Sequence, residues 1–164
     1  MRKLAFLSVL VFLLAASCTR SEKPAATGSM APNFTLQDIE GRNVALRDLK
    51  GKVVLLEFWA TWCAPCRVSI PAIEKIYAAY EGKGLAILGI SMDGGDWDSV
   101  KAFGKDFGIS YPILRGDDAV SQKYMVRTIP MFILIDREGN IRHRFLGAGN
   151  EDKIEKEIKT LLGV

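Results

Sequence analysis

Two cysteines stand two residues apart in the run Trp-Cys-Ala-Pro-Cys, which covers residues 62–66. This run directly follows an apolar segment at residues 53–59, which is typical of a strand buried on both faces. Residues 65–80 then carry apolar side chains at helical spacing, so the cysteines are expected where a buried strand ends and a helix begins. Two thiols at this spacing can close and reopen a small disulfide ring. The sequence therefore predicts thiol–disulfide exchange by side chains alone, without a cofactor.

The two cysteines are expected to have different roles. Cys63 would lie at the start of the helix, where unpaired N–H groups and the helix dipole stabilise a thiolate. A free cysteine has a pKa of about 8.5, and a helix N-terminus lowers it to roughly 3.5–7.5. We therefore predict that Cys63 is the nucleophile and that Cys66, one turn further on, resolves the mixed disulfide.

Other uses of a cysteine pair fit this sequence less well. A closed zinc site needs four ligands, and the only other candidates are Cys18 and His143. A static disulfide that closes so small a ring would constrain the unfolded chain little. Attachment of a c-type haem would need histidine at position 67, where the chain has Arg67.

The first 17 residues are predicted to be an export signal. Arg2 and Lys3 precede an apolar segment at residues 4–16, which is too short to span a bilayer comfortably. Without these two residues the chain has 20 basic and 19 acidic side chains, a balance that gives no reason to expect nucleic acid as a partner.

Small residues before Cys18 resemble the lipobox of bacterial lipoproteins, in which the cysteine is acylated, although Ala15 stands where leucine is commoner. An ordinary cleaved signal is the alternative. We predict a signal peptide at residues 1–17, an acylated Cys18 with a flexible tether to residue 30, and one folded domain at residues 31–164. The protein would be lipid-anchored on the periplasmic side of a bacterial membrane. Thr19 after the cysteine favours the outer membrane in a Gram-negative organism.

The pattern of the folded part indicates alternating strands and helices. Apolar strands separated by helices imply crossover connections and a mixed sheet covered on both faces. Expected strands cover residues 34–36, 43–46, 53–59, 85–92, 111–114, 131–136 and 141–147, and expected helices cover residues 65–80, 96–107 (with Asp96 as N-cap), 118–124 and 152–162.

The chain resembles the thioredoxin superfamily over roughly residues 32–162. The matching residues are Glu57, Trp59, Trp62, Cys63, Pro65, Cys66, Pro71 and Pro130. A β-hairpin before the first core strand and an extra helix–strand unit between residues 92 and 126 resemble the membrane-tethered TlpA/ResA-like reductases, which are related to peroxiredoxins. The resemblance implies an α/β thioredoxin-like fold with a central mixed β-sheet flanked by helices, an N-terminal hairpin and the inserted unit.

The resemblance also implies site residues. Pro130 would follow a cis peptide bond and face the cysteines, which leaves the backbone of Ile129 free to pair with an extended substrate. Glu57 would be a buried acid that acts as general base for Cys66, the alternative being a glutamate at the strand end that reaches solvent. The lysine that accompanies this acid in thioredoxins has no counterpart in residues 85–92.

The residues around the thiols, Trp62, Ala64 and Pro65, are assigned to the substrate-binding surface. We predict a monomeric reductant whose partners are proteins with disulfides or thiols, with a membrane thiol reductant as electron donor. Some relatives of this kind serve cytochrome c maturation.

Two other functions known for this fold, a thiol peroxidase and a copper-handling module, fit the sequence less well. A thiol peroxidase would need Pro-x-x-x-Thr/Ser-x-x-Cys, and no cysteine of the chain fits that pattern. A copper-handling module of this fold would use Cys-x-x-x-Cys with a distal histidine, whereas His143, between Arg142 and Arg144, is predicted to be solvated.

Overall fold

A computed structural model of the protein describes residues 26–95 and 97–164. The predicted signal peptide, Cys18 and residues 19–25 of the predicted tether lie outside the described residues, as does Asp96 with its predicted role as N-cap. In the described part of the chain, no helix is both long enough and apolar enough to cross a membrane.

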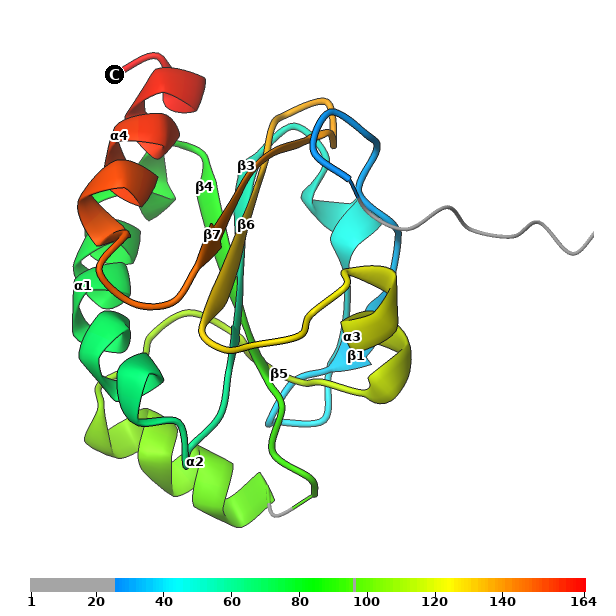
Figure 1. Ribbon diagram of the computed structural model, residues 1–164, viewed down its shortest axis with the longest axis vertical. Coiled ribbons are helices and arrows are strands. Elements are labelled where there is room, and N and C mark those ends of the chain that lie inside the picture. The colour runs from blue at the N-terminus through cyan, green and yellow to red at the C-terminus, as the bar shows by residue number, and fades with distance from the viewer. Residues whose placement is uncertain (1–25, 96) are drawn as a thin grey trace, which may run out of the picture.

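The central element is a five-stranded sheet with the strand order β5-β4-β3-β6-β7 (Figure 1). Neighbouring strands β3, β4 and β5 are parallel, whereas β6 and β7 are antiparallel to their neighbours. A separate antiparallel hairpin is formed by β1 and β2. The strands are β1 (Thr35–Gln37), β2 (Asn43–Ala45), β3 (Val53–Trp59), β4 (Leu85–Ser91), β5 (Ile113–Arg115), β6 (Met131–Ile135) and β7 (Ile141–Leu146). The helices are α1 (Ala64–Tyr80), α2 (Trp97–Asp106), α3 (Asp118–Lys123) and α4 (Glu151–Leu162), with short 3-10 turns at Leu46–Leu49 and Glu81–Lys83.

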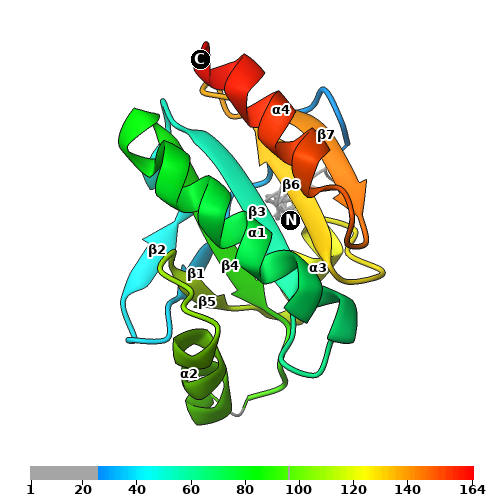
Figure 2. The same ribbon diagram turned by 90° about the vertical axis from the view of Figure 1, so that its left-hand side faces the viewer.

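This architecture confirms the predicted mixed sheet, the hairpin and the inserted helix–strand unit. Strand β3 is buried along its whole length because it lies in the middle of the sheet and both faces are covered. On one face, Val53 and Leu55 contact Ile73 of α1 and Ile154 of α4. These two helices lie side by side over the sheet (Figure 2).

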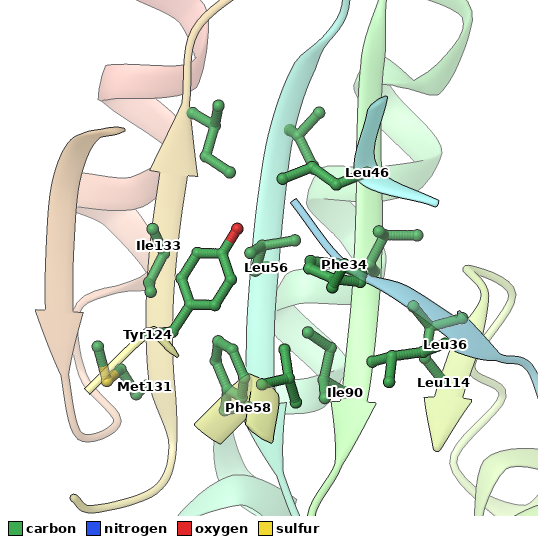
Figure 3. Close-up of a cluster of buried hydrophobic side chains, with 14 of the residues drawn as sticks. Phe34, Leu36, Leu46, Leu56, Phe58, Ile90, Leu114, Tyr124, Met131 and Ile133 are labelled. Atoms are coloured by element: carbon green, nitrogen blue, oxygen red, sulfur yellow. The ribbon is translucent and has the colours of Figure 1, made fainter. Parts of the chain in front are cut away.

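The opposite face of the sheet is covered by the hairpin and by α3. Leu56 and Phe58 of β3 pack against Phe34 before the hairpin and Tyr124 at the end of α3 (Figure 3). The hydroxyl of Tyr124 donates a hydrogen bond of 2.6 Å to the carbonyl of Pro32. The first described segment of the domain is thereby fixed to the segment that follows α3.

Helix α1 presents only one side to the core. Ile70 and Ile73 are fully buried, but Val68 is 73% exposed. Val68 is one of the apolar residues at helical spacing in residues 65–80, so the pattern alone predicts it to be buried. Successive residues of a helix are rotated by about 100°, so Val68 points roughly 200° away from Ile70. Helix α1 continues through Pro71 without a break.

Residues 28–31 lie along the turn that joins β6 and β7. The Gly28 N–H donates to the Ile141 carbonyl at 2.7 Å, and the Ala31 N–H donates to the Gly139 carbonyl at 2.8 Å. Met30 forms a β-bridge with Asn140. The last residues of the predicted tether are therefore hydrogen-bonded to the domain.

Candidate functional site

The cysteine pair lies at the junction of β3 and α1, as the sequence predicts. The Sγ atoms of Cys63 and Cys66 are bonded at 2.08 Å, and their Cα atoms are 5.3 Å apart. Cys63 is the N-cap of α1, and its Sγ accepts a hydrogen bond of 3.2 Å from the N–H of Cys66. Cys63 retains 4% exposure, whereas Cys66 has none. Of the two cysteines, Cys63 is therefore the one that reaches the surface.

The loop before Cys63 is held from two sides at Thr61. The carboxylate of Asp93, just beyond β4, accepts hydrogen bonds from the Thr61 hydroxyl at 2.6 Å and from its N–H at 3.0 Å. The Nε of Arg67 donates to the Thr61 carbonyl at 3.0 Å, and the guanidinium of Arg67 lies over the ring of Phe103. These contacts fix the path of the chain into the cysteine motif.

A groove of about 510 Å³ runs past Cys63. It is lined by Trp62, Cys63, Ala64, Pro65, Met92, Ser121 and residues 126–129. Trp62 is 70% exposed, so its ring is available to a bound molecule. The structure thus brings together all four residues predicted to bind substrate, including Ile129.

The peptide bond between Ile129 and Pro130 is cis, which confirms the prediction for this proline. Pro130 is buried, and its carbonyl accepts a hydrogen bond from the N–H of Gly147. Ile129 stands directly before it in the wall of the groove. Ile129 and the cysteine motif thus line the same groove.

Glu57 is fully buried within β3, so the alternative of a strand-end glutamate that reaches solvent is wrong. Burial raises the pKa of Glu57 to about 7, and the carboxylates of Glu151 and Glu74 act in the same direction. The hydroxyl of Tyr111 donates a hydrogen bond of 2.7 Å to Oε2, which opposes the rise in the Glu57 pKa. Among the described residues, Oε1 of Glu57 has no hydrogen-bond partner.

His143 is partly exposed to solvent, and it also makes contacts within the domain. Its Nε2 lies 3.1 Å from Oε2 of Glu157, and its ring stacks on Phe145. The side chain is 41% exposed, and it extends from the edge strand β7 to Glu157 of helix α4. Within residues 26–95 and 97–164, no three histidine, cysteine, aspartate or glutamate side chains are grouped so that they could hold a metal ion.

Comparison with known proteins places this site in a family. Residues 27–144 match the model of the AhpC/TSA family. The chain belongs to that family. It is 35% identical over 136 residues to the thiol-disulfide oxidoreductase ResA of Bacillus thuringiensis (strain Al Hakam), an alignment that covers 82% of this chain and 78% of the relative.

Solved structures agree with this family membership. A thiol:disulfide interchange protein of Chlorobium tepidum TLS has a TM-score of 0.76 and 27% identity, over 84% of this chain and 99% of its own. A thiol:disulfide interchange protein from Bacteroides sp. has a TM-score of 0.73 and 31% identity, over 85% and 92% of the two chains. With the cysteines at bonding distance, this AhpC/TSA family member is a thiol–disulfide oxidoreductase of thioredoxin-like fold.

Two residues of the site do not follow from the sequence motif of this oxidoreductase. Asp93 could have been found, because the carboxyl ends of the parallel strands β3 and β4 meet at the same edge of the sheet. Tyr111 gives only an indirect signal. Gly89 in the apolar strand β4 indicates that something approaches the backbone closely there.

Proposed function

We propose that this oxidoreductase reduces disulfide bonds of proteins in the bacterial cell envelope. The observation that carries the proposal is that Cys63 lines an open groove together with Ile129, whereas Cys66 is fully buried. An extended polypeptide that lies along Ile129 would bring its own disulfide to Cys63.

In the reduced enzyme, the Cys63 thiolate attacks one sulfur of the substrate disulfide. A Cys63–substrate disulfide forms, the substrate S–S bond breaks, and the first substrate sulfur leaves as a thiolate. Cys66 then loses its proton and attacks the sulfur of Cys63. The Cys63–Cys66 bond closes and the second substrate sulfur leaves, so the substrate gains two electrons and the enzyme is oxidised.

Glu57 is the proposed acceptor of the Cys66 proton. Its pKa of about 7 allows the carboxylate to take up and release a proton near neutral pH, which is the condition for an effective general base. The fully buried position of both Glu57 and Cys66 supports this role, because bulk water does not reach either group directly. No cofactor takes part in the proposed reaction.

Reduction as the proposed direction requires an electron supply. Exported compartments are oxidising, so a reductant there must be recharged, and we assign this step to a membrane thiol reductant. The N-terminal export signal and Cys18 support a lipid anchor. The likeness to the ResA and interchange proteins supports a reducing role, and cytochrome c maturation is one process that would use these electrons. Equilibration with thiol buffers of known potential tests the direction. A value near the roughly −270 mV of thioredoxin is expected, and one near the roughly −120 mV of a strong oxidant would overturn it.

The roles of the two cysteines are tested by trapping. Cys66→Ala should let Cys63 form mixed disulfides that cannot be resolved, so substrate proteins accumulate as bands that a reducing agent removes on a gel. Cys63→Ala is the matched control and should trap none of them. If both variants trap the same proteins, Cys63 is not the nucleophile.

Membership of the AhpC/TSA family makes a thiol peroxidase the second candidate. The position seven residues before Cys63 is Leu56, where the peroxidatic motif has proline. Consumption of hydrogen peroxide with a thiol donor distinguishes the two activities, and we expect none above the rate of the Cys63→Ala variant.

A further inference from the structure

A glycine in β4 makes room for an aromatic ring beside Glu57. Gly89 is the residue of β4 that pairs in register with Glu57 of β3. A Cβ atom at position 89 would lie 2.9 Å from Cε2 of Tyr111, closer than real Cβ contacts allow, and 3.0 Å from Nε1 of Trp59, which is also a tight contact. The ring of Tyr111 therefore occupies the space that a side chain at position 89 would need.

The position of Tyr111 is determined by packing on several sides. It is 2% exposed and precedes β5, whose Ile113 pairs with Gly89. The N–H of Gly89 donates to the carbonyl of Pro112 at 2.9 Å, which fixes the backbone beside Tyr111. The ring of Tyr77 from α1 meets that of Tyr111 edge-on, with the centroids 5.7 Å apart. The hydroxyl of Tyr111 is thus directed at Oε2 of Glu57 by a rigid surrounding.

The two oxygens of Glu57 differ because of this contact. Oε2 accepts the hydrogen bond from Tyr111, whereas Oε1 has no partner among the described residues. We propose that Tyr111 is a positioning residue for thiol–disulfide exchange, which holds Oε2 of Glu57 so that Oε1 is the oxygen that takes up and releases the proton of Cys66. The inference rests on the proposed role of Glu57 as proton acceptor.

The proton balance is consistent with a hydrogen bond that persists through the cycle. When Glu57 is ionised, Oε2 accepts from Tyr111. When the proton of Cys66 has moved to Oε1, Oε2 becomes the carbonyl oxygen of the acid and still accepts. The bond is stronger to the ionised form, so Tyr111 lowers the pKa of Glu57 against the effect of burial.

The charged groups around Glu57 disfavour its ionised form, and Tyr111 opposes them. Glu74 of α1 and Glu151 at the start of α4 both raise the pKa of Glu57 through space. In the described part of the chain, no basic side chain contributes to that pKa, and Tyr111 is the group that lowers it. A neutral hydroxyl therefore stabilises the buried carboxylate, in a chain whose strand β4 has no lysine to do so.

The test is Tyr111→Phe, which keeps the ring over Gly89 and removes only the hydroxyl. The carboxyl carbon of Glu57 is titrated by NMR in the oxidised protein, where the thiols do not interfere. Loss of a hydrogen bond to a charged group should raise the midpoint by about one pH unit or more. The pH profile of single-turnover reduction of a disulfide peptide should move upward by the same amount. Tyr77→Phe is the matched control, because its hydroxyl interacts with Glu81 instead, and it should leave both midpoints unchanged.

The inference is overturned if the titration midpoint of Glu57 is the same in Tyr111→Phe and in the parent. It is also overturned if the pH profile of turnover does not shift together with that midpoint. If Tyr111→Phe does not fold, the Cζ resonance of Tyr111 in the parent decides. It should change with pH at the midpoint of Glu57, and an unchanging resonance overturns the inference. Failure of the parent to reduce any disulfide would overturn the proposed function instead, and the carboxyl titration would still measure the effect of Tyr111 on Glu57.

Discussion

At the residue scale, Glu57 couples the stability of the fold to pH. Its pKa is about 7 in the folded protein against 4.5 for a free glutamate, so the folded state keeps its proton to higher pH than the unfolded state does. Stability from this group is complete below pH 4.5, falls as the pH rises, and levels off above 7. A shift of this size corresponds to about 3 kcal/mol.

Glu57→Gln should therefore remove a specific part of the pH dependence. The variant carries no charge, so its free energy of unfolding should change less between pH 4.5 and 7.5 than that of the parent, with a difference of about 3 kcal/mol across the range. Urea unfolding at several pH values measures both proteins under the same conditions. Parallel curves for parent and variant would show that folding does not raise the pKa of Glu57.

The part of the site that the sequence predicts is the part that is contiguous in the chain or marked by a family motif. Cys63 and Cys66 follow from the strand–helix junction, and the cis bond before Pro130 follows from the resemblance. Tyr111 comes from another segment, and its approach depends on the register of β4 against β3 and β5. Pattern analysis of single segments does not give that register.

At the element scale, the long apolar strands and amphipathic helices are predicted well, whereas short elements shift at their ends. β5 is expected at residues 111–114 but is formed by Ile113–Arg115. The difference arises because the ring of Tyr111 is used to fill the space over Gly89, and pairing with β4 begins only at Ile113. Helix α3 likewise ends one residue earlier than expected, at Lys123, with Tyr124 as its C-cap and its ring in the core.

Helix α3 depends on its cap because it has only six residues. The carboxylate of Asp117 accepts a hydrogen bond of 2.7 Å from the N–H of Val120. Asp117→Ala should lower the free energy of unfolding by about 1 kcal/mol, through loss of the N-cap. Asp118→Ala is the matched control. Asp118 is also exposed and lies in the first turn, where its charge interacts favourably with the helix dipole, so the loss should be about 0.3–0.5 kcal/mol. Equal losses in chemical denaturation would mean that the cap does not stabilise α3.

At the scale of the whole molecule, the chain enters the domain at the end of the sheet opposite the cysteines. Met30 pairs with Asn140, in the turn that follows β6. Because β6 is antiparallel to β3, its last residue, Ile135, lies beside Val54 at the start of β3. Cys63 follows the other end of that seven-residue strand, about 23 Å away. An anchor at Cys18 would hold the near end toward the membrane and turn the groove away from it.

The three tryptophans of the chain report on this orientation. Trp62 directly precedes Cys63, Trp59 is the last residue of β3, and Trp97 packs against the cluster that contains both cysteines. In vesicles whose lipids carry bromine on the acyl chains, protein that has been acylated at Cys18 should show the same tryptophan fluorescence as in unbrominated vesicles, because bromine quenches only at close range. Met30→Trp adds a probe at the near end, at a position that is 65% exposed, and its additional fluorescence should be quenched. Strong quenching of the native tryptophans would place the groove against the membrane, where a disulfide of a large exported protein could not approach Cys63.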